Sequence, residues 1–193
     1  MSQSKNNKYT DVDKEALRLD WVFDKGINFK DRIIQLTGEI ETQASFDYID
    51  AALTEMERGS KKAITIKINS PGGSPTEALA IVGRLRNSKC QIVTEVYGEV
   101  MSAAVLILAA GDKRRMSKYA VFMHHESSYS ISGEHSSVKD AVERAEREEE
   151  LWAKYMQEFT EKDTYFWKYS VIKKNMFLDA YECYAYGVID EIF

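Results

Sequence analysis

The chain has 193 residues, 44% of them hydrophobic and 30% charged, which is typical of one globular domain with its own core. Its net charge of −5 offers no basic surface for nucleic acid, so we expect no nucleic-acid partner. Cys90 and Cys183 are too few for a disulfide framework, and neither a signal-peptide core nor a membrane-spanning segment is recognisable. We therefore expect a cytoplasmic protein.

The first elements alternate between strand and helix. Residues 1–14 are polar and are predicted to form a loosely ordered arm. Residues 32–38 read as a short strand closed by glycine, and residues 46–58 have apolar side chains at helical spacing. Isoleucines then alternate with polar residues over 64–69, which predicts a strand with one covered face.

A glycine turn over residues 70–73 links this strand to a well-marked helix. Ser74 suits the N-cap, Pro75 the first helical position, and Glu77 the reciprocal position of a capping box. The helix carries one apolar stripe over residues 78–85.

The middle of the chain repeats the pattern. Residues 91–97 form the next predicted strand, and residues 102–110 form a helix that is apolar all round and therefore buried. Residues 119–123 are a further strand leading into His124. Short links between strands and helices indicate an α/β fold of stacked βαβ units on a largely parallel sheet.

The last third differs from this pattern. A loop over 127–137 is followed by a long charged helix over 137–159, whose narrow apolar seam favours packing on another subunit. The alternative is an amphipathic helix that is solvated on its own subunit. A short helix from Asp179 to Gly187 and a closing strand over 188–190 complete the chain.

Ser102 is the first candidate for chemistry. A serine at the start of a helix is an ordinary N-cap, but with a base and oxyanion donors it becomes a nucleophile. The backbone N–H of Ala103 is the natural local donor, and Gly73 permits a second close approach.

The histidines offer a base. His124 follows a strand, where a side chain can point over the end of the sheet. His124 and His125 face opposite ways by strand alternation, so at most one of them serves, and His135 lies in a polar loop. No cluster has metal-ligand spacing and no phosphate-binding glycine loop occurs, so we expect neither a metal nor a cofactor.

Together these motifs resemble those of the Clp protease proteolytic subunits, the ClpP-like serine peptidases of the crotonase-like superfamily. The resemblance spans about residues 30–193. It rests on the strand over 32–40, the glycine loop over 68–73, the serine segment over 98–104, the histidine strand over 121–124 and the C-terminal segment over 177–190.

The resemblance implies Ser102 as nucleophile, His124 as general base, and the amides of Gly73 and Ala103 as the oxyanion hole. The family's catalytic aspartate falls on Asn175, which can orient the histidine but cannot neutralise its charge. The implied architecture is a ClpP/crotonase-like fold with a protruding handle helix, assembled as two stacked heptameric rings and fed by an AAA+ unfoldase.

The implied domains are an arm over 1–29 that diverges from the family, which puts unfoldase docking in question, and a peptidase domain over 30–193 with its handle at about 127–162. The implied activity is a serine endopeptidase acting on unfolded polypeptides or peptides inside a ring chamber. Asn175 motivates a second hypothesis, a catalytically impaired ring subunit. A third is acyl-CoA chemistry on the same fold, which needs no serine–histidine pair.

Overall fold

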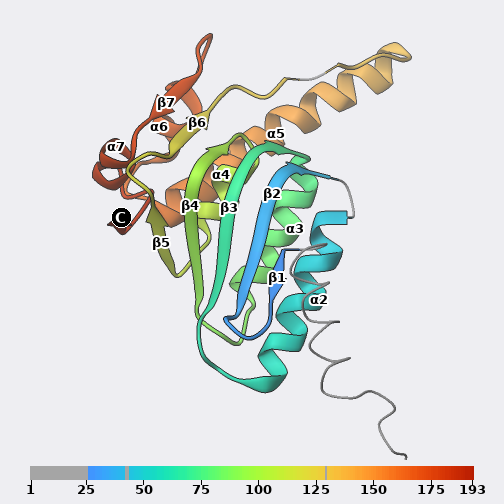
Figure 1. Cartoon of the computed structure of the whole chain (residues 1–193). Coiled ribbons are helices and arrows are strands. Elements are labelled where there is room, and N and C mark those ends of the chain that lie inside the picture. The colour runs from blue at the N-terminus through green and yellow to red at the C-terminus, as the bar shows by residue number, and fades with distance from the viewer. Residues whose placement is uncertain (1–25, 42–43, 129) are drawn as a thin grey trace, which may run out of the picture.

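A mixed, mainly parallel sheet runs through the centre of the protein, as the computed structural model shows for residues 26–41, 44–128 and 130–193 (Figure 1). Its main path follows the order β1-β2-β3-β4-β5-β8, while β6 pairs with β4 and β7. The strands are β1 (Ile27–Asn28), β2 (Ile33–Ile40), β3 (Ile64–Gly73), β4 (Ile92–Met101), β5 (Lys113–Met116), β6 (Val121–His124), β7 (Met176–Leu178) and β8 (Glu191–Ile192). The predicted α/β class is confirmed.

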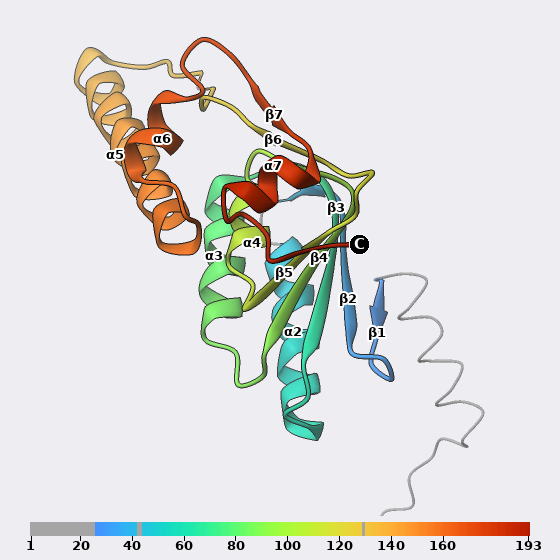
Figure 2. The same cartoon turned by 90° about the vertical axis from the view of Figure 1, so that its left-hand side faces the viewer.

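Three helices cover one face of this sheet: α2 (Ala44–Gly59), α3 (Pro75–Arg86) and α4 (Ala104–Ala109) (Figure 2). The inward isoleucines of β3, Ile64, Ile66 and Ile68, are at most 1% exposed. All six residues of α4 are buried, as its uniformly apolar sequence predicts. The helix begins at Ala104, however, two residues later than expected, because β4 continues to Met101 and is followed by a turn.

The long helix α5 (His135–Phe159) projects from the body at its N-terminal end (Figure 1). Ala153 and Met156, in its C-terminal half, are buried against the core of the same subunit. Val142, in the projecting half, is 43% exposed. The apolar seam is therefore divided: its C-terminal half packs on its own subunit, and in its other half Val142 is open although Ala145 is buried.

The capping box predicted at Ser74 and Glu77 is only half formed in the structure. The Ser74 side chain accepts a hydrogen bond from the Glu77 N–H, as predicted. The Glu77 carboxylate does not return to the cap: it is buried and accepts the Phe46 N–H at 2.6 Å instead, so it joins α3 to α2. A complete capping box occurs later, where Asp179 and Glu182 begin α7 (Ala180–Ala185).

The structure tests the strand predicted near the C-terminus but not the arm predicted at the N-terminus. The closing strand is β8, at Glu191–Ile192, rather than residues 188–190. It pairs in parallel with β5, and Asp190 binds Arg114 just before it. The predicted arm over 1–14, and most of the segment 1–29, lie outside the described residues.

Candidate active site

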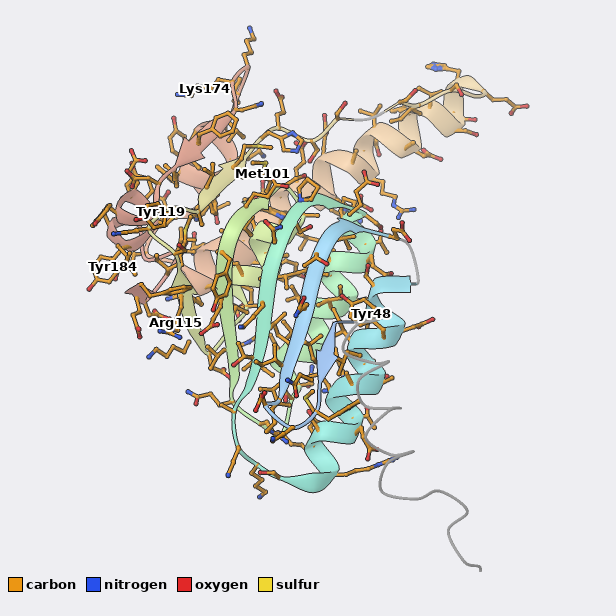
Figure 3. All side chains as sticks on the ribbon, viewed as in Figure 1. Tyr48, Met101, Arg115, Tyr119, Lys174 and Tyr184 are labelled. Carbon is orange, nitrogen blue, oxygen red and sulfur yellow. The ribbon has the colours of Figure 1, made fainter. Side chains whose placement is uncertain are left out.

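Ser102 occupies a strained turn between β4 and α4. Its φ of 52° lies in the left-handed region, which a residue with a side chain adopts at a cost. Its N–H donates to the Met123 carbonyl at 2.9 Å, so the end of β4 is joined to the end of β6. Ser102 is not a helix cap, because the N-cap of α4 is Ala103 and no side chain caps that helix. Figure 3 labels the preceding residue, Met101, at the end of β4.

The histidine in contact with Ser102 is His125, whereas the family resemblance implies His124 as the general base. The His125 Nε2 lies 2.8 Å from the Ser102 Oγ. Both histidines follow the alternation of β6, in which Phe122 and His124 are buried. Since His124 points inward with Phe122, the next residue is the one that turns towards the serine.

His124 is instead enclosed by aromatic residues. Its Nε2 lies 3.0 Å from the Trp167 carbonyl, so this nitrogen carries the proton and donates it. Its ring stacks on Trp152 with centroids 4.2 Å apart, and it is 6% exposed. Burial lowers the pKa of His124 to about 4, against the raising effect of the hydrogen bond to Trp167, and the neighbouring His125 lowers it further. His124 is therefore a neutral core residue at neutral pH.

The glycine turn at the end of β3 lies directly against the serine. An added Cβ on Gly72, whose φ is 100°, would lie 2.7 Å from the Ser102 Cβ and 3.0 Å from the Ala103 nitrogen. The buried Ser70 hydroxyl holds this turn, because it donates to the Gly38 carbonyl and accepts the Gly72 N–H. Only glycine fits at position 72 without displacing the serine.

The two backbone N–H groups expected to form the oxyanion hole belong to Gly73 and Ala103. Gly73 pairs with Ile40 of β2, and the Ile40 carbonyl accepts the N–H of Ser74 rather than that of Gly73. In a parallel ladder this pattern directs the Gly73 N–H away from β2, to the side of β3 where β4 and Ser102 lie. Ala103 follows Ser102 directly and supplies the second N–H.

Asn175 lies opposite His125 when the pairing of β6 with β7 is continued by one residue. The antiparallel register joins His124 to Met176 as its last pair, and His125 and Asn175 are the next residues beyond it. His125 and Asn175 thus follow the last pair of the two strands, and among the described residues no hydrogen bond joins them. Within the described ranges, no carboxylate is hydrogen-bonded to His125.

Asn175 lines a polar hollow of ≈350 Å³, to which Glu126, the residue after His125, also contributes. Its wall comes from the segment after His125 and from the segment between α6 (Thr164–Tyr169) and β7, where Figure 3 labels Lys174. The lining residues are Glu126, Ser127, Ser128, Val171, Lys173, Lys174 and Asn175. Asn175 is therefore open to water on this side.

The sequence motifs leave His125 as one of two candidate histidines, and they assign no separate role to Gly72 or Ser70. The alternation of β6 could have pointed to His125 if the inward position of Phe122 had been known. Among the described residues, no cluster of three or more His, Cys, Asp or Glu side chains could hold a metal ion. None of the helices in the described residues could span a membrane.

The sheet, the serine turn and the glycine turn define a protein of the ClpP-like class. The chain matches the Clp protease family over residues 20–193, and it belongs to that family. It is also similar to the ATP-dependent Clp protease proteolytic subunit 1 of Rhodococcus jostii (strain RHA1), with 29% identity over 171 residues, which cover 85% of this chain and 76% of the relative.

The close approach of the two turns generates a first prediction. Gly72→Ala places a methyl group against Ser102 in a left-handed backbone, so we expect the free energy of unfolding to fall by about 2 kcal/mol or more, and Ser102 to lose its alignment. Urea denaturation measures the first effect, and the rate of labelling by a fluorophosphonate measures the second.

Gly83→Ala is the matched control, because no atom lies within 4 Å of its added Cβ and the position is inside α3. This variant should be more stable by about 0.5–1 kcal/mol, since alanine is the better helix former. Equal effects of the two substitutions would show that Gly72 is not required by the serine turn.

The buried His124 predicts a component of acid sensitivity. Its pKa is about 4 in the folded protein and 6.5 for an ordinary histidine, so above pH 6.5 it is neutral in both states. Between pH 6.5 and 4 the unfolded chain binds a proton that the folded chain does not, and stability is lost, by about 3 kcal/mol in total. Below about pH 4 this component causes no further loss.

Urea denaturation between pH 7.5 and 4 measures this component. His124→Gln should remove it, whereas His125→Gln, a change at a half-buried position, should keep it. The same pH dependence in the wild type and in His124→Gln would contradict the assignment.

Proposed function

We propose that this protein is a serine endopeptidase of Clp type that cleaves unfolded polypeptides or peptides. The observation that carries the proposal is the 2.8 Å contact between the Ser102 Oγ and the His125 Nε2 at a strained turn beside two backbone donors. This is the arrangement of a nucleophile and a general base. It favours a peptidase over acyl-CoA chemistry, which has no need of such a pair.

In the proposed mechanism, His125 Nε2 accepts the proton of Ser102 while the serine oxygen attacks the carbonyl carbon of the scissile peptide bond. Negative charge then develops on the carbonyl oxygen, where the N–H groups of Ala103 and Gly73 stabilise it. His125 passes its proton to the leaving amine. It next activates a water molecule that hydrolyses the acyl-enzyme and regenerates the serine.

Asn175 has a restricted role in this mechanism. Its amide oxygen can accept the Nδ1–H of His125, which leaves Nε2 free as the base. The amide is neutral and gives no charge stabilisation to the imidazolium that forms. Activity below that of a complete triad is therefore part of the proposal, and a catalytically impaired ring subunit is its alternative.

We also propose that the protein works as a ring oligomer. The support is the projecting half of α5, whose Val142 side chain is open on the isolated subunit. The similar protein from Rhodococcus jostii is named as a proteolytic subunit of an ATP-dependent protease. Stacked heptamers and an AAA+ unfoldase partner are the corresponding proposals for this chain, and native mass spectrometry tests the first of them.

The nucleophile is tested with a fluorophosphonate, with intact mass to count the adduct and peptide mapping to locate it. We expect one adduct per chain, on Ser102. In Ser102→Ala, both the adduct and the hydrolysis of a fluorogenic peptide should be lost. His125→Ala should reduce the rate by about 10²–10⁴-fold, because it removes the general base. Lys61→Ala, an exposed change in the loop before β3, is the control and should behave as the wild type. A folded wild type that takes no label would overturn the proposal.

The role of Asn175 is tested by restoring a carboxylate. Asn175→Asp should raise kcat for peptide hydrolysis, with an upper limit of about 10⁴-fold, the cost of the opposite change in a trypsin-type triad. Asn175→Ala is the control for the orienting hydrogen bond and should lower kcat. A brisk wild type that Asn175→Asp does not improve would exclude the impaired-subunit alternative.

A further inference from the structure

His124 is buried directly behind the candidate base, where the proposed reaction does not use it. Its ring lies between two tryptophans: it stacks on Trp152 of α5 and meets Trp167 of α6 edge-on, with centroids 5.7 Å apart. Its Nε2–H is donated to the Trp167 carbonyl at 3.0 Å. One side chain therefore connects the last residue of β6 to two helices that lie later in the chain.

The acceptor of this hydrogen bond is itself held firmly. Trp167 is fully buried, and its indole Nε1–H donates to the Thr160 Oγ1 at 2.9 Å. Its ring also lies 6.3 Å from that of Phe122, which shares the inward face of β6 with His124. The carbonyl that receives the His124 proton is thus part of a packed aromatic cluster rather than of a loose loop.

The backbone after His124 has few other restraints. Strand pairing with β7 ends at the pair of His124 with Met176, and β4 pairs with β6 only as far as Met123. His125 therefore follows the last residue that the sheet holds. The direction in which its ring points depends on how the residue before it is anchored.

We propose that His124 is a positioning residue, which aims the His125 ring at Ser102 through its hydrogen bond to the Trp167 carbonyl and its stacking on Trp152. This inference rests on the proposed function, in which His125 is the base. The alternative is that His124 is a buried residue that contributes only to folding stability.

Variants of the full chain separate the two roles. His124→Phe keeps an aromatic ring against Trp152 but cannot donate to the Trp167 carbonyl, and His124→Gln can still donate through its amide. We expect fluorophosphonate labelling of Ser102 to slow by about 10²-fold in His124→Phe, the order of effect of a small misplacement of a catalytic group, and to be largely restored in His124→Gln. Urea denaturation of each variant monitors folding.

A second variant tests the same anchor if His124→Phe does not fold. Trp152→Leu, at a half-buried position of α5, removes the stacking partner and should slow labelling in the same direction. Labelling at the wild-type rate in every variant that folds would overturn the proposal. So would equal slowing in His124→Phe and His124→Gln, because the hydrogen bond would then not matter.

A readout independent of turnover keeps this test separate from that of the proposed function. In the wild type, Ser102→Ala should shift the ¹⁵Nε2 resonance of His125, because the two groups are in contact. The same substitution in the His124→Phe background should leave that resonance unchanged. If Ser102 takes no label, the proposed function fails, yet loss of the shift would still support positioning by His124. Persistence of the shift would refute it.

Discussion

The candidate site depends on the hydrogen bond from the Ser102 N–H to the Met123 carbonyl. It extends the parallel pairing of β4 with β6 by one step beyond the pair of Met101 with Met123, and so places the serine beside the residues that follow β6. The same bond accompanies the left-handed backbone of Ser102, whose cost of about 1–3 kcal/mol the surrounding structure must offset. The serine hydroxyl is consequently presented to His125 and is not used to cap α4.

The end of the neighbouring strand β3 is held by hydrogen bonds from side chains. Two polar side chains of β3, the buried Ser70 and the exposed Asn69, replace the regular ladder where its register shifts. The Ser70 hydroxyl bridges the Gly38 carbonyl and the Gly72 N–H, and the Asn69 Oδ1 accepts the Glu99 N–H. Gly98 leaves room for that amide, since an added Cβ would lie 2.3 Å from the Asn69 oxygen. The serine turn and the glycine turn are brought together by these contacts, and each needs small residues where the backbones approach.

Local rules predict much of this fold and a part of the site. The alternation of β3 and the cap at Ser74 depend on nearby residues, and both are confirmed. Glu77 could not be placed by the same rules, because its partner is the backbone of α2, 31 residues earlier. The choice between His124 and His125 likewise depends on residues that are distant in sequence. Alternation states that they face opposite ways, but the inward face of β6 is defined by Trp152 and Trp167, which lie far along the chain.

The consequence of Asn175 follows from the surroundings of His125. In a closed triad, an imidazolium in a medium of low dielectric depends on its carboxylate, because little water is there to solvate the charge. Here Asn175 is exposed and forms part of a polar hollow, so water can solvate the imidazolium of the half-buried His125. Lys173 and Lys174 in the same wall oppose that charge, and Glu126 offsets one of them. In the proposed mechanism, the energetic penalty of the missing carboxylate is therefore smaller than in a closed triad, and it grows when a bound substrate displaces water from the hollow.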